Sequence, residues 1–162
     1  MTQVRITTLA VDSEGEPVVI LKPVDDAPGH GLLLPIWIGP METAAILIAM
    51  GATDQPTRPL TYDLLVNLLT ACEAEVERVE VTQLVEGTFH AAITLRTPGG
   101  TRIVDARPSD SIALALRVGA PTFVADDVLT AAGIPDSAER AEQDLAEFGE
   151  FLDNVEPEDF RN

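Results

Sequence analysis

The stretch IVDARPSD, residues 103–110, places two carboxylates and one guanidinium directly before an apolar helical run. Asp105 ends a predicted strand, and Asp110 lies one turn into a helix that Pro108 opens. Two converging carboxylates can hold Mg²⁺ or Mn²⁺, which neutralises a phosphorane-like charge and generates hydroxide. Arg107 could hold a phosphate oxygen through two hydrogen bonds. The stretch therefore offers candidate groups for an active site, with Asp105, Arg107 and Asp110 as catalytic residues and the two aspartates as metal ligands.

The same stretch also has a purely structural interpretation. An acidic residue near the third position of a helix stabilises the positive end of the helix dipole by about 0.3–1 kcal/mol. Asp110 occupies such a position, and Arg107 could simply pair with Asp105. Both interpretations stay open on the sequence alone.

The second half of the chain repeats the pattern of the first half at an offset of 68 residues. Pro40 and Glu42 align with Pro108 and Asp110, so a second helix is expected to begin with proline and carry an acid in its first turn. This equivalence indicates either helix-start stabilisation in both copies or a cleft shared between them. Glu42 is therefore a further candidate catalytic residue.

Four other residues are candidates for contacting a substrate: Arg58, Asp63, His90 and Ser109. Arg58 precedes a proline and is therefore extended; it either reaches the substrate or pairs with Asp63 or another nearby acid. His90 lies on the polar face of a predicted strand over 89–95, where an unused, half-exposed histidine is the alternative. No nucleotide-cradling glycine loop, zinc-ligand spacing or nucleophile elbow accompanies these residues.

The charge of the chain limits how it can meet a nucleic acid. Its 162 residues carry 27 acidic and 10 basic side chains, a net charge of −17, and Lys22 is the only lysine. Phosphate backbones are bound chiefly by clustered Lys and Arg. Binding through a basic patch is therefore excluded, and nucleic-acid chemistry would need a local arginine pocket or a bridging divalent cation.

No segment has the features of a signal peptide or a membrane span. The N-terminus lacks a basic region followed by an apolar stretch. The longest helical apolar run, Ala44–Met50, is far too short to cross a bilayer. We expect a cytoplasmic protein without a membrane partner.

The chain predicts an α+β fold with a mainly antiparallel sheet, because hairpin-length connections join the strands. Covering helices are expected, and the very apolar strand 32–38 is expected at the centre. The predicted organisation is a domain over 1–135, with an internal repeat of about 1–75 and 76–135. An acidic amphipathic helix and tail over 136–162 follow it.

The tail 136–162 carries ten acidic and two basic residues, and one apolar stripe runs from Ala138 to Val155. A helix this acidic is marginal by itself, so the stripe is expected to dock on the domain or on a partner subunit. The charged face would then repel approaching anionic ligands, like a shield.

Four segments in order resemble the bifunctional nuclease domain family: LPIWIGPMETAAI, RPLTYDLL, VEGTFHAAITL and VDARPSDSIALALR. The resemblance spans about residues 1–135. It implies a duplicated three-strand, two-helix unit that forms one barrel-like sheet, a homodimer, and nuclease activity on DNA and RNA.

The chain departs from the family pattern at three positions. The family often has His where Tyr62 stands, Tyr where His90 stands and an acid where Pro40 stands. The loss of that histidine removes a general base or metal ligand, which His90 could replace. The alternative function is a non-catalytic binding or regulatory module of a bacterial-type cytoplasmic protein.

Overall fold

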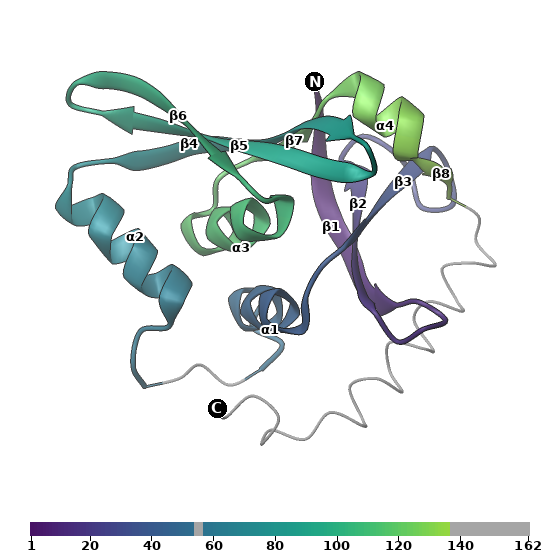
Figure 1. The fold of residues 1–162 in the computed structure, drawn as a ribbon, viewed down its shortest axis with the longest axis horizontal. Coiled ribbons are helices and arrows are strands. Elements are labelled where there is room, and N and C mark those ends of the chain that lie inside the picture. The colour runs from purple at the N-terminus through teal and green to yellow at the C-terminus, as the bar shows by residue number, and fades with distance from the viewer. Residues whose placement is uncertain (54–56, 137–162) are drawn as a thin grey trace.

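The computed structural model describes residues 1–53 and 57–136. Strands come in two groups of three, each followed by a helix (Figure 1). The elements are β1 (Thr2–Val11), β2 (Pro17–Pro23), β3 (Leu32–Trp37), α1 (Pro40–Ala49), α2 (Thr61–Ala71), β4 (Glu75–Val85), β5 (Thr88–Thr97), β6 (Gly100–Ala106), α3 (Pro108–Val118), β7 (Thr122–Val124), α4 (Asp126–Ala132) and β8 (Ile134–Pro135).

The strands form one sheet in the order β6-β5-β4-β7-β1-β2-β3-β8. All neighbouring strands are antiparallel except β4 and β7, which are parallel. The predicted α+β class with a mainly antiparallel sheet is confirmed. The sheet is open, with β6 and β8 at its edges, so barrel-like closure and the duplicated unit are not confirmed and stay predictions from the sequence.

Strand β3 was expected at the centre of the sheet, and this was wrong: it lies between β2 and the two-residue edge strand β8. Its apolar character has another cause. Leu34 and Ile36 share a core cluster with Val128 and Leu129 of α4, which packs on this strand. A helix that covers an outer strand buries its side chains as fully as further strands would.

Helices α1, α2 and α3 gather on one side of the β4–β5–β6 part of the twisted sheet (Figure 1). Helix α3 contacts both α1 and α2 and supplies buried Ile112, Ala113, Leu114 and Ala115. Strand β2 is buried along its whole length. Burying each large aliphatic side chain contributes about 1.5–3 kcal/mol, so α3 and β2 form a rigid frame for the helix ends.

Prolines and one glycine define the helices that matter for the site. Pro40 and Pro108 occupy the first turns of α1 and α3, where a missing N–H costs nothing. Helix α3 ends at Gly119, whose φ of 69° lies in the left-handed region that glycine adopts without strain. The helix starts predicted from the repeat are confirmed.

No helix in the described ranges is long and apolar enough to cross a membrane. Apart from its first residue, Asp136, the predicted tail helix lies outside the described residues.

Candidate functional site

The starts of α1 and α3 meet at the side chain of Arg107. This residue occupies the N-cap position of α3 with an extended backbone (φ −74°, ψ 148°). Its Nη2 lies 2.7 Å from Glu42 Oε1, in the first turn of α1. The sequence-equivalent acids of the two helices therefore share one arginine.

The contact between Arg107 and Asp110 uses both carboxylate oxygens. Arg107 Nε donates to Asp110 Oδ2 at 2.7 Å, and Nη2 donates to Asp110 Oδ1 at 3.0 Å. The two parallel hydrogen bonds fix the plane of the guanidinium group, and the carboxylate also attracts it by charge. The side chain of Arg107 is 66% exposed, whereas that of Glu42 is 15% exposed. The two acids thus hold an arginine that solvent, or a solvent-borne anion, can reach.

Tyr62 of α2 completes the cluster. Its hydroxyl donates to Asp110 Oδ1 at 2.6 Å. Burial raises the pKa of Tyr62 and the neighbouring Asp110 raises it further, so the phenol stays protonated at neutral pH. Burial also raises the pKa of Asp110, but hydrogen bonds from Arg107 and Tyr62 outweigh it and the pKa falls below its usual value. Asp110 is therefore ionised at neutral pH and is held in place by hydrogen bonds from two residues, Arg107 and Tyr62. We call Glu42, Tyr62, Arg107 and Asp110 the helix-start cluster.

Asp105 lies on a strand, whereas the helix-start cluster is built from residues at the starts of helices. Asp105 is exposed near the end of edge strand β6, opposite Ala92 of β5. Within the described residues, the side-chain partners of Arg107 are Glu42 and Asp110, so the alternative pairing of Arg107 with Asp105 was wrong. Packing of α1 on α3 brings Glu42 to the arginine that binds Asp110, and the role of Asp105 as a catalytic residue and metal ligand stays a prediction.

The predicted substrate-binding residues have different surroundings. Ser109 is buried in the first turn of α3, and His90 is exposed on β5. Arg58 is exposed before α2. Asp63 does not pair with Arg58 as expected; it accepts a hydrogen bond from Arg117 Nε at 2.8 Å. Asp63 also accepts one from the Leu60 backbone N–H, which lowers its pKa ahead of any contribution from Arg117.

Sequence reasoning missed Arg117 altogether. Its guanidinium carbon lies 5.1 Å from the centre of the Tyr62 ring, so Tyr62 touches Arg117 with its face and Asp110 with its hydroxyl. The spacing held a signal, since residues seven apart on a helix share one face. Arg117 stands seven residues after Asp110 and belongs to the same side of α3.

Two carboxylates of the cluster, Glu42 and Asp110, bind the same arginine, but among the described residues they do not form a ready-made metal site. No group of three or more His, Cys, Asp or Glu side chains among residues 1–53 and 57–136 is placed to hold a metal ion. Mg²⁺, however, often takes only one or two protein carboxylates and completes its shell with phosphate oxygens and water. Glu42 and Asp110 converge on the Arg107 guanidinium, so their oxygens already face one cation.

Residues 19–137 match the family model described as Bifunctional nuclease domain. The chain belongs to the bifunctional nuclease domain family. The resemblance found in the sequence is thereby confirmed, and all four residues of the helix-start cluster lie within the part that matches the bifunctional nuclease domain.

Two kinds of relative share this bifunctional nuclease domain. Uncharacterized protein Rv1829 of Mycobacterium tuberculosis (strain ATCC 25618 / H37Rv) is 39% identical over 170 residues, which cover 99% of each chain. Bifunctional nuclease 1 of Arabidopsis thaliana is 33% identical over 116 residues, which cover 70% of this chain and 34% of the plant protein. Bifunctional nuclease 2 of the same plant is 33% identical over 65% of this chain and 32% of its own length.

Proposed function

We propose that this protein hydrolyses phosphodiester bonds of DNA and RNA at the helix-start cluster. The observation that carries the proposal is the shared arginine: Glu42 and Asp110, from two different helices, both bind the exposed Arg107. Membership of the bifunctional nuclease domain family and the two plant relatives named as nucleases support this reaction class.

Each member of the cluster has a role that follows from its contacts. Arg107 binds a non-bridging phosphate oxygen, for which a guanidinium is well shaped, and stabilises the charge that develops during attack. Glu42 takes the proton of the attacking water, as a carboxylate within reach of the same arginine can. Asp110 orients Arg107 from one side, and the Tyr62 hydroxyl holds Asp110 in turn. The starts of α1 and α3 add partial positive charge near the phosphate.

We also propose that Mg²⁺ or Mn²⁺ assists, with Asp110 as its protein ligand and with phosphate oxygens and water in its other positions, which leaves Glu42 to act as the base. The bound ion would supply charge neutralisation and a more acidic water at the phosphate. Such an ion suits an acidic chain, because a net charge of −17 otherwise opposes an approaching nucleic acid.

The test is cleavage of plasmid DNA and of a single-stranded RNA by the full chain, with Mg²⁺, with Mn²⁺ and with a chelator. Cleavage that needs either ion supports the whole proposal. Cleavage that persists in the presence of the chelator contradicts the proposed metal dependence but supports phosphodiester hydrolysis. Absence of cleavage under all conditions contradicts the reaction and favours the regulatory alternative.

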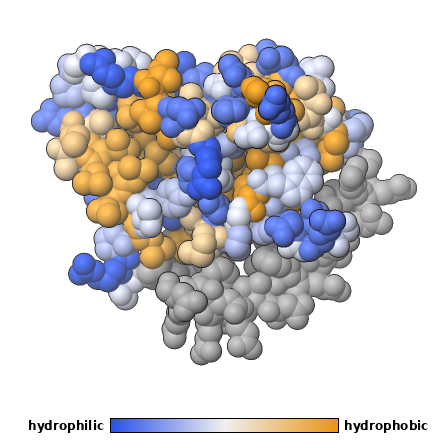
Figure 2. Space-filling model, viewed as in Figure 1, coloured by the Kyte–Doolittle hydropathy of each residue, from blue (hydrophilic) through white to orange (hydrophobic). Residues whose placement is uncertain are grey.

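We propose a homodimer on separate grounds. None of the residues of α2 is buried, and Leu64, Leu65 and Leu68 are exposed on it. Figure 2 shows this helix within a broad apolar area on one face of the molecule. Monomeric proteins rarely expose large contiguous apolar patches, and a second copy of the chain would cover this one.

We expect light scattering at micromolar concentration to give twice the chain mass of 17.3 kDa. A variant with Leu64→Glu and Leu68→Glu should give the single mass, because charge on a buried interface costs several kcal/mol. A wild-type mass of one chain across that concentration range would contradict the dimer.

A further inference from the structure

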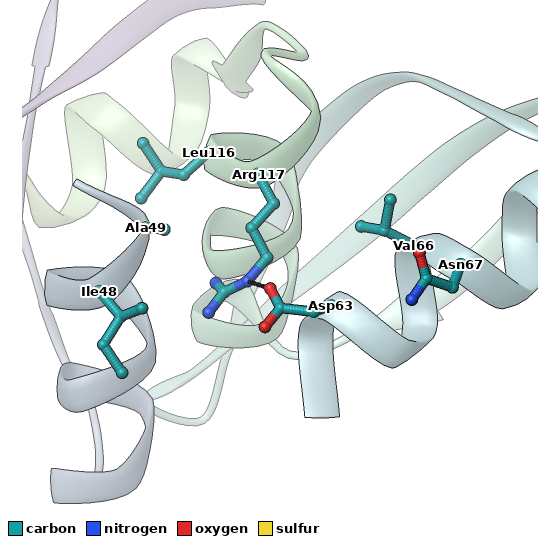
Figure 3. A pocket seen from close by; sticks show the side chains of 7 residues that line it. All are labelled: Ile48, Ala49, Asp63, Val66, Asn67, Leu116 and Arg117. Atoms are coloured by element: carbon teal, nitrogen blue, oxygen red, sulfur yellow. Dashed lines mark hydrogen bonds and ion pairs between the residues drawn. The ribbon is translucent and has the colours of Figure 1, made fainter. Parts of the chain in front are cut away.

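A pocket of about 320 Å³ lies between α1, α2 and α3, beside the helix-start cluster. Its walls are Ile48 and Ala49 of α1, Val66 of α2 and Leu116 of α3 (Figure 3). Its polar lining consists of Asp63, Asn67 and Arg117. The pocket thus combines aliphatic walls with a few polar groups, the composition typical of small-ligand sites.

One polar atom in this pocket has no partner among the described residues. The Arg117 side chain is only 7% exposed, and three of its hydrogen bonds are accounted for: Nε donates to Asp63, and Nη1 donates to the carbonyl oxygens of Ala45 and Ala113. Its Nη2 is buried and unsatisfied within the part of the chain that is described. Buried donors are almost always satisfied in native proteins, by protein groups, ordered water or a ligand, so Nη2 is available to an acceptor that enters the pocket beside Arg117.

The charge balance of the pocket favours a neutral ligand over an anion. Asp63 bonds directly to the Arg117 guanidinium and holds one negative charge beside the free Nη2. A carboxylate or phosphate placed there would meet that charge at close range. A carbonyl oxygen accepts from Nη2 without this repulsion.

The remaining polar group narrows the class of ligand. Asn67, on the exposed side of α2, carries an amide oxygen that can accept and an amide nitrogen that can donate. A ligand with a carbonyl next to an N–H could therefore bond to Arg117 and Asn67 together. Guanine, uracil and thymine carry such an edge on a flat ring with apolar faces, which aliphatic walls can hold. Adenine has no carbonyl, and the cytosine carbonyl lies beside a ring nitrogen that carries no hydrogen, so neither base presents this edge.

The position of the pocket suits a nucleotide that spans it and the cluster. Arg117 lies seven residues after Asp110 on α3, so the two positions are about 10 Å apart along one face. Tyr62 bridges them, with its hydroxyl on Asp110 and its ring against Arg117. This separation is comparable with the reach from a phosphate to the outer edge of its own base.

We propose that the Arg117 pocket binds one unstacked nucleobase whose carbonyl accepts from Arg117 Nη2 and whose adjacent ring N–H donates to Asn67. This assignment rests on the proposed function, since it makes the pocket the base subsite of the same nucleic-acid substrate. Proteins that extract single bases read them in this way, with apolar side chains on the faces and hydrogen bonds on the edge.

The test is binding of uridine and cytidine, which differ on the reading edge and carry no phosphate. Titration of the ¹⁵N-labelled full chain, followed by NMR, should show uridine binding at least tenfold more tightly than cytidine. Ala49→Leu fills the pocket and should weaken uridine binding at least tenfold. The matched control Ala131→Leu adds the same atoms to an exposed position of α4, outside the pocket, and should bind uridine like the wild type.

Three results would overturn the proposed nucleobase site. They are equal affinity for the two nucleosides, absence of uridine binding, and unchanged uridine binding by a folded Ala49→Leu variant. A well-dispersed spectrum of each variant establishes that it is folded. The cleavage assay reports separately on the proposed function. Selective uridine binding without cleavage contradicts the proposed nuclease activity but supports nucleobase binding in the Arg117 pocket. Cleavage without selective uridine binding contradicts only the proposal that the Arg117 pocket binds a nucleobase.

Discussion

Replacement of Asp110 by Asn should lower the rate of phosphodiester cleavage by at least about 100-fold, the usual cost of losing one preorganised charged group at an active site. Asp110 accepts hydrogen bonds from Arg107 Nε, Arg107 Nη2 and the Tyr62 hydroxyl. An amide of the same shape offers only one oxygen and no negative charge. Arg107 would then lose the partner that fixes the plane of its guanidinium group. The cleavage rate is measured on a short labelled oligonucleotide.

Asp126→Asn is the matched control for this variant. Asp126 stands in the first turn of α4, as Asp110 does in α3, and accepts bonds from Thr2 and from the N-terminal amine. Both variants remove an acid that favours a helix start. An equal loss of activity in both would assign the effect to helix stability and would contradict a role of Asp110 at the phosphate.

Lys22→Met should lower the free energy of unfolding by about 3 kcal/mol, because it leaves the buried Asp136 carboxylate without its counter-charge. Lys22 is 1% exposed and Asp136 is 6% exposed. Lys22 Nζ donates to Asp136 and, at 2.6 Å, to the Ala27 carbonyl oxygen, while the Gly29 N–H donates to Asp136 Oδ2 at 2.9 Å. The pair therefore joins β2, the following loop and the segment after β8.

The control for Lys22→Met is Arg96→Met, which breaks an ion pair whose two side chains are each 69% exposed. Such surface pairs contribute about 0–1 kcal/mol. Urea unfolding should show a large shift for Lys22→Met and little for Arg96→Met. The double variant Lys22→Met, Asp136→Leu should recover most of the loss, since apolar replacement of a buried pair is often neutral. Equal shifts for the two single variants would contradict this account of the pair.

The same pair has a defined pH dependence. The hydrogen bond from Lys22 holds the pKa of Asp136 below its usual value of 3.8. A carboxylate with a lowered folded-state pKa stabilises the protein above the unfolded pKa, and this contribution is lost as pH falls through the folded one. The difference in stability between wild type and Lys22→Met should therefore shrink when unfolding is repeated at about pH 3.

Local signals in the sequence were sufficient to predict the starts of α1 and α3 and the positions of two residues of the helix-start cluster. Pro40 and Pro108 open helices whichever way the helices pack, so the positions of Glu42 and Asp110 in first turns followed directly. The α+β class followed from short connections, which force antiparallel neighbours.

The partners of the charged side chains depend on packing and could not be predicted in this way. Arg107 has Asp105 and Asp110 close in sequence, but the approach of α1 brings Glu42 to it as well. Asp63 has Arg58 five residues away, yet the contact of α2 with α3 delivers Arg117. In both cases the sequence offered a near partner, and tertiary structure supplied one from another helix.

The most direct test of the central claim compares four chains purified through identical steps: the wild type, Glu42→Gln, Asp110→Asn and Asp126→Asn. Cleavage of one labelled oligonucleotide is followed with Mg²⁺ or Mn²⁺ present. We expect equal rates for the wild type and Asp126→Asn, and rates at least about 100-fold lower for the two cluster variants. Equal cleavage by all four chains, or none by the wild type, would contradict a nuclease site at the starts of α1 and α3.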